Sequence, residues 1–204
     1  NPTFESIYAI VPSIPPILLI LVPAILMAVS VVREKELGSI TNFYVTPTSR
    51  LEFLIGKQLP YIAIGMINFV ILTAMSVLIF KVPIKGSGAT LLLCALLYVT
   101  VTTGIGLLIS TFTSSQVAAV FVTAILTILP TTQFSGLMQP VSTLDGGARV
   151  VGSLWPTTYY MRSSVGAFTK GLGPDRLAND ALALAAFIPV LTLVTAAALK
   201  RQEA

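Results

Sequence analysis

The chain contains no histidine and a single cysteine among its 204 residues. Without histidine it lacks the most usual general base, the commonest metal ligand and the base of a Ser-His-Asp triad. The one cysteine, Cys94, cannot close a disulfide within the chain and cannot form a zinc-ligand set by itself. These absences exclude a conventional hydrolase and a zinc protein. We therefore expect no catalytic residue, no metal site and no cofactor bound by this chain.

Charged residues are also scarce, at 10% of the sequence, whereas 55% is hydrophobic and the mean hydropathy is +0.91. A soluble domain carries about a quarter of its residues as charges to coat its surface. The apolar residues occur in uninterrupted runs, without the alternation that marks the strands of a membrane β-barrel. We therefore expect an integral membrane protein built of helices. Its charge-free runs are Ser6–Val32, Gln58–Phe80, Gly86–Leu144 and Ala181–Leu199.

The third run is too long for one crossing, since a membrane-spanning helix needs about 20 apolar residues. Its polar cluster STFTSSQ, residues 110–116, suits a tight turn at the membrane surface, so we divide the run there. The sequence thus predicts one transmembrane domain over residues 1–204, an all-α polytopic helical membrane bundle with its two ends on opposite sides. The predicted spans are about 10–32, 58–80, 89–111, 116–138 and 181–199.

Basic residues near span ends orient a membrane protein, because cytoplasmic loops are enriched in Lys and Arg. Each side of this bundle carries six, so a plain count decides nothing. The side opposite residues 33–57 holds most of its basic residues in the long 139–180 segment, some of them far from any span. Giving more weight to the basic residues close to span ends favours a cytoplasmic location for the 33–57 loop. The net charge of +4 forms no basic stripe interleaved with aromatics, so no nucleic acid is expected as a partner.

The central parts of the predicted spans carry no Asp, Glu, Lys or Arg, which disfavours a proton-coupled pump. Uncharged polar side chains remain, and a hydroxyl in a helix commonly bonds to a carbonyl of its own helix. A substrate route is the alternative to that structural interpretation, and its candidates are Thr100, Thr102, Thr103 and Gln133. Small residues four apart, such as Gly106 with Ser110, allow helix backbones to approach closely.

The loop between the first two spans holds seven of the chain's charged residues within residues 31–57. A short amphipathic helix is predicted there from the apolar residues Leu37, Ile40, Phe43 and Tyr44. Pro47 ends it, and Ser49 with Glu52 has the spacing of a capping box, so a second helix begins near Arg50 and continues into the next span. Two interpretations stay open. The element either rests on the membrane surface or docks a soluble partner.

A resemblance to ABC-2 type permeases, the membrane subunits of a class of ABC transporters, is carried by two segments. The family's R-E-[KR]-E-x-G-[ST] … T-P … L-I-G-K pattern resembles residues 33–60, REKELGSITNFYVTPTSRLEFLIGKQLP. The stretch after the family's fifth helix is similar to residues 134–168, FSGLMQPVSTLDGGARVVGSLWPTTYYMRSSVGAF. The likeness covers nearly the whole chain in order. It implies a six-helix fold with both termini in the cytoplasm, in which this chain starts in the external segment and lacks the first helix.

In that family the corresponding loop carries the coupling helix, which packs into a groove of the ATP-binding subunit. The resemblance therefore implies a cytoplasmic coupling loop at residues 33–57. It also implies, as partner, an ABC ATPase domain or subunit that binds ATP and Mg. The implied docking residues are Arg33, Glu34, Glu36, Gly38, Ser39 and Phe43. Asn42 departs from the family pattern, because many members carry an acidic residue there.

Residues 139–180 are too polar to span a membrane and too apolar for an ordinary loop. Glycines and prolines divide them into short pieces, and their aromatic residues suit the belt at a membrane surface. The resemblance implies an external re-entrant segment of short helices dipping into the outer leaflet. The candidates for an external gate are Trp155, Tyr159 and Tyr160, and a belt that only anchors the bundle is the alternative.

The leading hypothesis is the permease part of an ATP-driven ABC-2 type exporter, multi-pass in the cell membrane, with a bacterial inner membrane expected. Its expected partners are the ATPase, a second permease copy in a homo- or heterodimer, and membrane lipid. The alternative is a membrane anchor that tethers a fused or partner ATPase without transport. An ion channel is disfavoured, because the sequence has no charged rings and no filter-like motif.

Overall fold

The described part of the chain is helical. The computed structural model describes residues 7–38, 50–137 and 141–200, and these residues contain no strand. In chain order the elements are α1 (Ile7–Ile10), η1 (Val11–Ser13), α2 (Ile14–Glu36), α4 (Arg50–Ala74), η2 (Met75–Ile79), α5 (Gly88–Phe112), α6 (Gln116–Phe134), η3 (Val141–Thr143), α7 (Gly146–Ser153), α8 (Pro156–Val165), η4 (Gly166–Lys170) and α9 (Pro174–Lys200). The elements η2 and η4 are single π-helical stretches, and η1 and η3 are 3₁₀ turns.

Within the described residues, five helical stretches are long and apolar enough to cross a membrane. Each reaches the roughly 20 residues that a crossing needs. They are Val11–Glu36, Leu54–Ile79, Gly88–Phe112, Gln116–Phe134 and Pro174–Ala198. The predicted fold class, an all-α polytopic membrane bundle, is confirmed.

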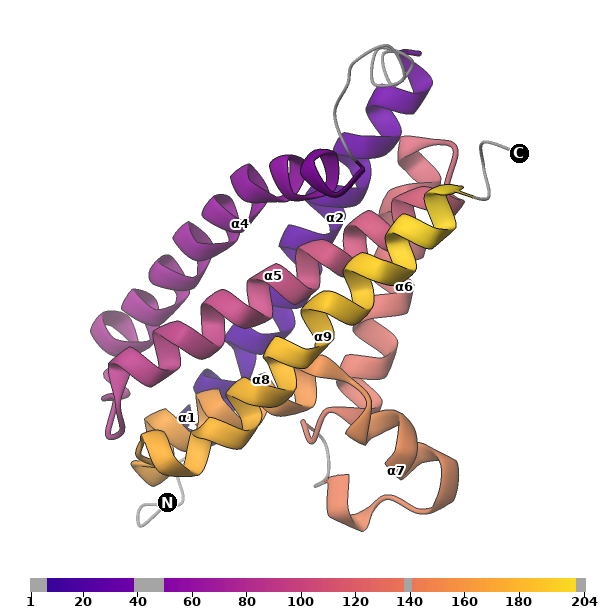
Figure 1. The fold of residues 1–204 in the computed structure, drawn as a ribbon. Helices are drawn as coiled ribbons and strands as arrows, with labels where there is room; N and C mark the ends of the chain where they lie inside the picture. Colours follow the sequence, from indigo (N-terminus) through magenta and orange to yellow (C-terminus); the bar gives the residue numbers. More distant parts are fainter. Residues whose placement is uncertain (1–6, 39–49, 138–140, 201–204) are drawn as a thin grey trace.

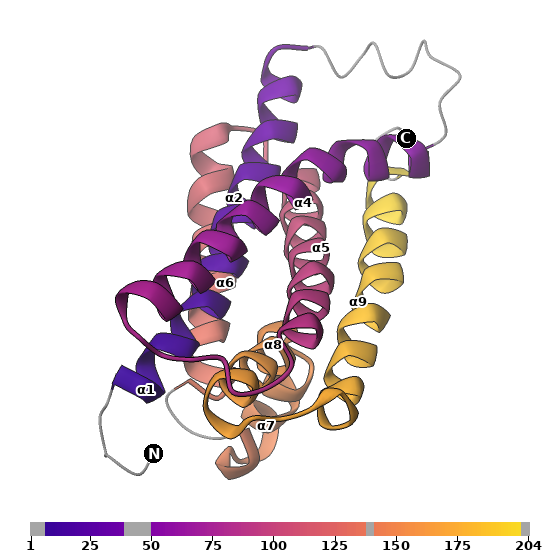
Figure 2. The ribbon, with the colours of Figure 1, turned by 90° about the vertical axis from the view of Figure 1, so that its left-hand side faces the viewer.

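Helix α5 lies at the centre of this bundle. It packs against α2, α9 and α4, and α2 also packs against α6 and α4. Figures 1 and 2 show α5 running among these neighbours. Accordingly, 61% of the most apolar 18-residue stretch of α5 is buried inside the protein, whereas the buried share of the corresponding stretch is 17% in α4 and 11% in α9. The outer helices therefore turn large apolar side chains, such as Ile67 of α4 and Leu193 of α9, away from the protein core.

Contact between α2 and α5 depends on a glycine. A Cβ atom at Gly106 would overlap the carbonyl oxygen of Ala24 and lie 2.9 Å from its Cα. Inside a bilayer the hydrophobic effect does not draw helices together, because lipid tails are as apolar as side chains. Close packing of backbones at small residues then supplies the attraction. The prediction that Gly106 permits a close helix approach is confirmed.

Three helix ends differ from the predicted spans. Helix α2 continues beyond residue 32 to Glu36, because its charged residues find partners described below. Helix α6 ends at Phe134 instead of 138, and Gly136 then takes a φ of +91°, which glycine adopts without strain. Helix α9 begins at Pro174 instead of 181, with proline in the first turn where it fits well. Charge alone therefore does not locate these helix ends.

Two other boundaries follow the sequence prediction. The turn between α5 and α6 occupies residues 113–115, and the Oγ of Ser115 accepts a hydrogen bond from the backbone N–H of Ala118 at 3.2 Å. Ser115 thus caps α6. Helix α4 begins at Arg50 and runs unbroken through Lys57 into its apolar part. The capping residue predicted for it, Ser49, lies outside the described residues.

Candidate functional site

Three consecutive charged residues at the end of α2, Glu34, Lys35 and Glu36, each contact a different part of the chain, and we call them the α2 clamp. Adjacent residues of an α-helix point about 100° apart, because one turn takes 3.6 residues. Glu34 faces α4, where its carboxylate forms an ion pair with the ammonium group of Lys57. The last turn of α2 is thereby joined to the first turns of α4.

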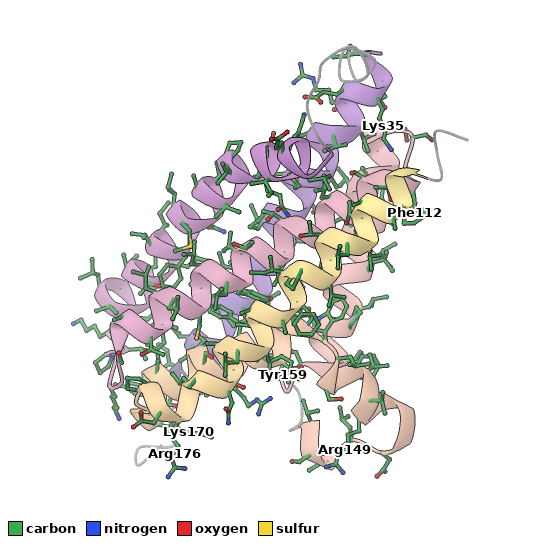
Figure 3. The ribbon with its side chains drawn as sticks, viewed as in Figure 1. Lys35, Phe112, Arg149, Tyr159, Lys170 and Arg176 are labelled. Atoms are coloured by element: carbon green, nitrogen blue, oxygen red, sulfur yellow. The ribbon has the colours of Figure 1, made fainter. Side chains whose placement is uncertain are left out.

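Lys35 faces the end of α5. Its Nζ donates to the carbonyl oxygen of Ser110 at 2.6 Å and to that of Thr111 at 3.3 Å. The last carbonyls of a helix have no partner within the helix and carry the negative end of its dipole. Lys35 therefore caps α5 with a positive charge. Figure 3 shows Lys35 and Phe112, the last residue of α5, at the same end of the bundle.

Glu36 faces the start of α6. One carboxylate oxygen accepts the backbone N–H of Gln116 at 2.8 Å, and the other accepts the side-chain amide of the same residue. The first N–H groups of a helix are unpaired within it and form the positive end of its dipole. The α2 clamp thus supplies a cation to the end of α5 and an anion to the start of α6, which is the favourable sign at each end.

The structure describes most of the residues predicted to dock an ATPase. Glu34 and Glu36 use their carboxylates within the chain, as the clamp shows. Arg33 is exposed at the same end of α2. Ser39 and Phe43 lie outside the described residues. Docking of an ATPase by these residues stays a prediction. The carboxylates of Glu34 and Glu36 also have a structural function within the chain.

Gly38 closes α2. Its N–H donates to the carbonyl oxygen of Lys35 at 3.1 Å, and its φ of +71° lies in the left-handed region. Glycine commonly ends a helix in this way because it has no Cβ to clash. A Cβ at Gly38 would meet no other described atom within 4 Å. Backbone conformation, and not crowding within the described residues, is therefore the reason for glycine here.

The threonines predicted for a substrate route bond to their own helix. The hydroxyls of Thr100, Thr102 and Thr103 donate to carbonyl oxygens of the preceding turn of α5, at 2.8 to 3.0 Å. Thr102 and Thr103 are fully buried, whereas Gln133 is exposed near the end of α6. These bonds agree with the structural interpretation of the hydroxyls. A route through these residues stays a prediction.

At the opposite end of the bundle, α8 is held by a series of hydrogen bonds that we call the Thr157 network. The hydroxyl of Tyr98 lies 2.9 Å from both the carbonyl oxygen of Pro16 and the Oγ1 of Thr157. The Oγ1 of Thr157 is 3.2 Å from that of Thr131, which accepts the indole N–H of Trp155 at 3.0 Å. The network joins α2, α5, α6 and α8 through buried polar groups.

The residues predicted as an external gate differ in their surroundings. Tyr160 is fully buried and stacks on Tyr98 with ring centroids 4.4 Å apart. It therefore lies in the core, and its assignment to a surface aromatic belt was wrong. Burial raises the pKa of the Tyr160 phenol well above its usual value, so the group stays neutral. Trp155 and Tyr159 are half-buried, and a gate formed by them stays a prediction.

Replacing Thr157 by valine is expected to destabilise the bundle by about 1–3 kcal/mol, because the buried hydroxyls of Tyr98 and Thr131 each lose a partner. Thermal unfolding of the purified protein in detergent measures the change. Thr132→Val is the matched control, since among the described residues the Thr132 hydroxyl bonds only to carbonyls of its own helix. Equal shifts in the two variants would show that the network adds nothing specific.

No site function was predicted for Lys35, Lys57 or Gln116. For Lys35 the sequence signal is the run Glu34-Lys35-Glu36 at the end of an apolar helix. Charged side chains in such a position can interact with the dipoles of neighbouring helix ends. The run does not identify its partners. Lys35 and Glu36 bond to residues 75 to 80 positions away in the sequence, a separation that only the fold resolves.

Comparisons with known proteins point to one family. The family model described as "ABC-2 family transporter protein" matches residues 1–197. "Probable multidrug ABC transporter permease YbhS" of Escherichia coli (strain K12) is 32% identical over 186 residues, covering 91% of this chain and 49% of that protein. "Probable multidrug ABC transporter permease YbhR" of the same strain is 28% identical over 144 residues, covering 71% of this chain and 39% of that protein. The chain therefore spans about half the length of YbhS. No solved structure matches at a significant level.

Proposed function

Because the chain belongs to the ABC-2 family of transporter proteins, we propose that it forms the membrane-spanning permease part of an ATP-driven exporter. The family match confirms the resemblance seen in residues 33–60 and 134–168, and the chain is a multi-pass membrane protein. In this proposal an ABC ATPase domain or subunit binds ATP and Mg and docks in the cytoplasm at the end of α2. A second permease copy completes the route by which substrate moves outward.

The observation that carries this proposal is the α2 clamp. A force applied where α2 ends reaches α4 through the Glu34–Lys57 ion pair, α5 through Lys35 and α6 through Glu36. Hydrogen bonds to charged groups are stronger than those between neutral groups. Four helix ends are thereby connected, so they move together when the ATPase pushes on this end. This is the behaviour that a coupling element requires.

The same helices carry movement to the far end of the bundle. Helices α2 and α5 pack closely at Gly106, and both contribute to the Thr157 network that holds α8. The hydroxyl of Ser164 in α8 also donates to the carbonyl oxygen of Pro12 at 2.6 Å. These contacts support a rigid connection from the ATPase end to Trp155 and Tyr159, which we place at the external exit.

Cysteine labelling in intact cells tests the orientation on which the proposal depends. Leu37 at the end of α2 is 70% exposed, and Leu154 between α7 and α8 is 65% exposed, so either accepts a cysteine without disturbing the core. In a Cys94→Ala background, a membrane-impermeant maleimide should label Leu154→Cys in intact cells. It should label Leu37→Cys only after the cells are permeabilised. The reverse pattern would place the α2 clamp outside the cell, beyond the reach of a cytoplasmic ATPase.

A further inference from the structure

A cavity of about 910 Å³ opens at the end of the bundle opposite the α2 clamp. It lies between α7 on one side and α8, η4 and the start of α9 on the other. Pockets that hold drug-sized ligands measure roughly 300–1,000 Å³, so this cavity is large enough for one. Neither the α2 clamp nor the predicted gate residues line it.

The lining of the cavity is rich in cations. Its cationic residues come from four elements, and they are Arg149 of α7, Arg162 of α8, Lys170 of η4 and Arg176 of α9. The acidic residue among the lining side chains is Asp180. Figure 3 shows Arg149 on α7 and, across the same end of the molecule, Lys170 and Arg176 near the start of α9.

Most of this positive charge is uncompensated. The Nη2 of Arg162 lies 3.5 Å from a carboxylate oxygen of Asp180, so these two charges offset each other. Arg149, Lys170 and Arg176 are exposed, and none forms an ion pair with another residue in the described ranges. Three cations on separate elements thus border one volume. Such an arrangement attracts an anion, because a cleft lined by charges of one sign concentrates the counter-ion.

The lining also contains apolar side chains, which are Val141, Val150, Met161, Val165 and Leu172. A free inorganic anion would gain nothing from them, whereas a molecule with an acidic head and a hydrocarbon tail would contact both the cations and the apolar side chains. The other acidic residues of this region, Asp145 and Asp175, do not line the cavity. The positive end of α9 begins two residues before Arg176, at Pro174, and adds to the attraction for an anion.

We propose that this cavity binds an anionic phospholipid, with its head group between Arg149 on one side and Lys170 and Arg176 on the other, and its acyl chains against the apolar side chains. Guanidinium and ammonium groups form charge-assisted hydrogen bonds with phosphate oxygens. Basic pockets between membrane-spanning helices bind acidic lipid head groups for this reason. The bound lipid joins α7 to η4 and α9. This inference concerns lipid recognition and does not depend on the direction of transport.

Native mass spectrometry of the purified protein tests the site, with phosphatidylglycerol and phosphatidylcholine offered in equal amounts. We expect phosphatidylglycerol to be retained in preference to phosphatidylcholine. The variant Lys170→Gln/Arg176→Gln should retain phosphatidylglycerol at least roughly tenfold less, since two charge-assisted contacts are lost. The matched control is Lys81→Gln/Lys85→Gln, which removes two exposed cations from the same end but outside the cavity, and it should behave like the parent protein.

Several outcomes would overturn the proposal. Equal retention of the two lipids would show that the head-group charge is not recognised, and equal loss in both double variants would show a general charge effect. Displacement of phosphatidylglycerol by millimolar inorganic phosphate would assign the cavity to a soluble anion instead. If the cavity variant does not fold, the single change Arg149→Gln on α7 tests the same cavity from its other side, with the thermal midpoint in phosphatidylcholine confirming folding.

Discussion

Gly106→Ala is expected to destabilise the bundle by about 3 kcal/mol, because the added methyl group would overlap the carbonyl oxygen of Ala24. A flexible side chain could rotate away from a new methyl group, but the backbone of α2 cannot. Helices α2 and α5 must then move apart, and the contacts along their shared length are weakened. We expect a lower yield of folded protein and a lower thermal midpoint in detergent.

Gly56→Ala is the matched control for this substitution. Gly56 lies in α4, and a Cβ there meets no described atom within 4 Å. Alanine also favours a helix over glycine by about 1 kcal/mol, so the control should not lose stability. If Gly106→Ala unfolds at the same temperature as the control, the close approach of α2 and α5 does not contribute to stability as described.

Lys35→Glu is expected to break the contact between the α2 clamp and the end of α5, and so to stop movement from passing from the docked ATPase to the rest of the bundle. The new carboxylate would face the carbonyl oxygens of Ser110 and Thr111 at the negative end of α5, beside Glu36. We expect ATP hydrolysis by the assembled transporter to persist. The effect of ATP on the far end, measured as the maleimide labelling rate of Leu154→Cys in a Cys94→Ala background, should fall at least roughly tenfold.

The control for this prediction is Lys35→Arg, which keeps a cation near the same carbonyl oxygens and should retain the response to ATP. A structural defect alone would lower the thermal midpoint and the ATPase activity together, so both are measured in each variant. An ATP-dependent labelling change that survives in Lys35→Glu would contradict transmission through the clamp. A docked ATPase with no such change even in the parent protein would favour a membrane anchor over a transporter.

Much of the fold could be predicted because bilayer thickness constrains the length of an apolar helix. The turn near residue 113 and the start of α4 at Arg50 each had a local chemical signal, a polar cluster and a capping box. Gly106 had the small-residue spacing of close helix pairs. These features depend on residues near one another in the sequence, which is why they could be predicted.

Other features depend on partners that the sequence does not identify. Asp175, Arg176 and Asp180 belong to α9, although charge alone excluded them from the predicted span. Tyr160 had the composition of a surface aromatic but is buried by stacking on Tyr98. Arg33, Glu34 and Glu36 were predicted to face a partner protein, but Glu34 and Glu36, together with Lys35, also hold helix ends of their own chain. Each outcome follows from contacts between distant segments.

The most direct test of the coupling proposal is a disulfide crosslink between Leu37→Cys and cysteines scanned along the associated ATPase, with Cys94 replaced by alanine. Leu37 is exposed directly after the α2 clamp, so a docked ATPase should lie within reach of it. We predict a crosslink whose yield changes when ATP is added. No crosslink at any scanned position in a complex that is folded and active as an ATPase would contradict docking at the end of α2.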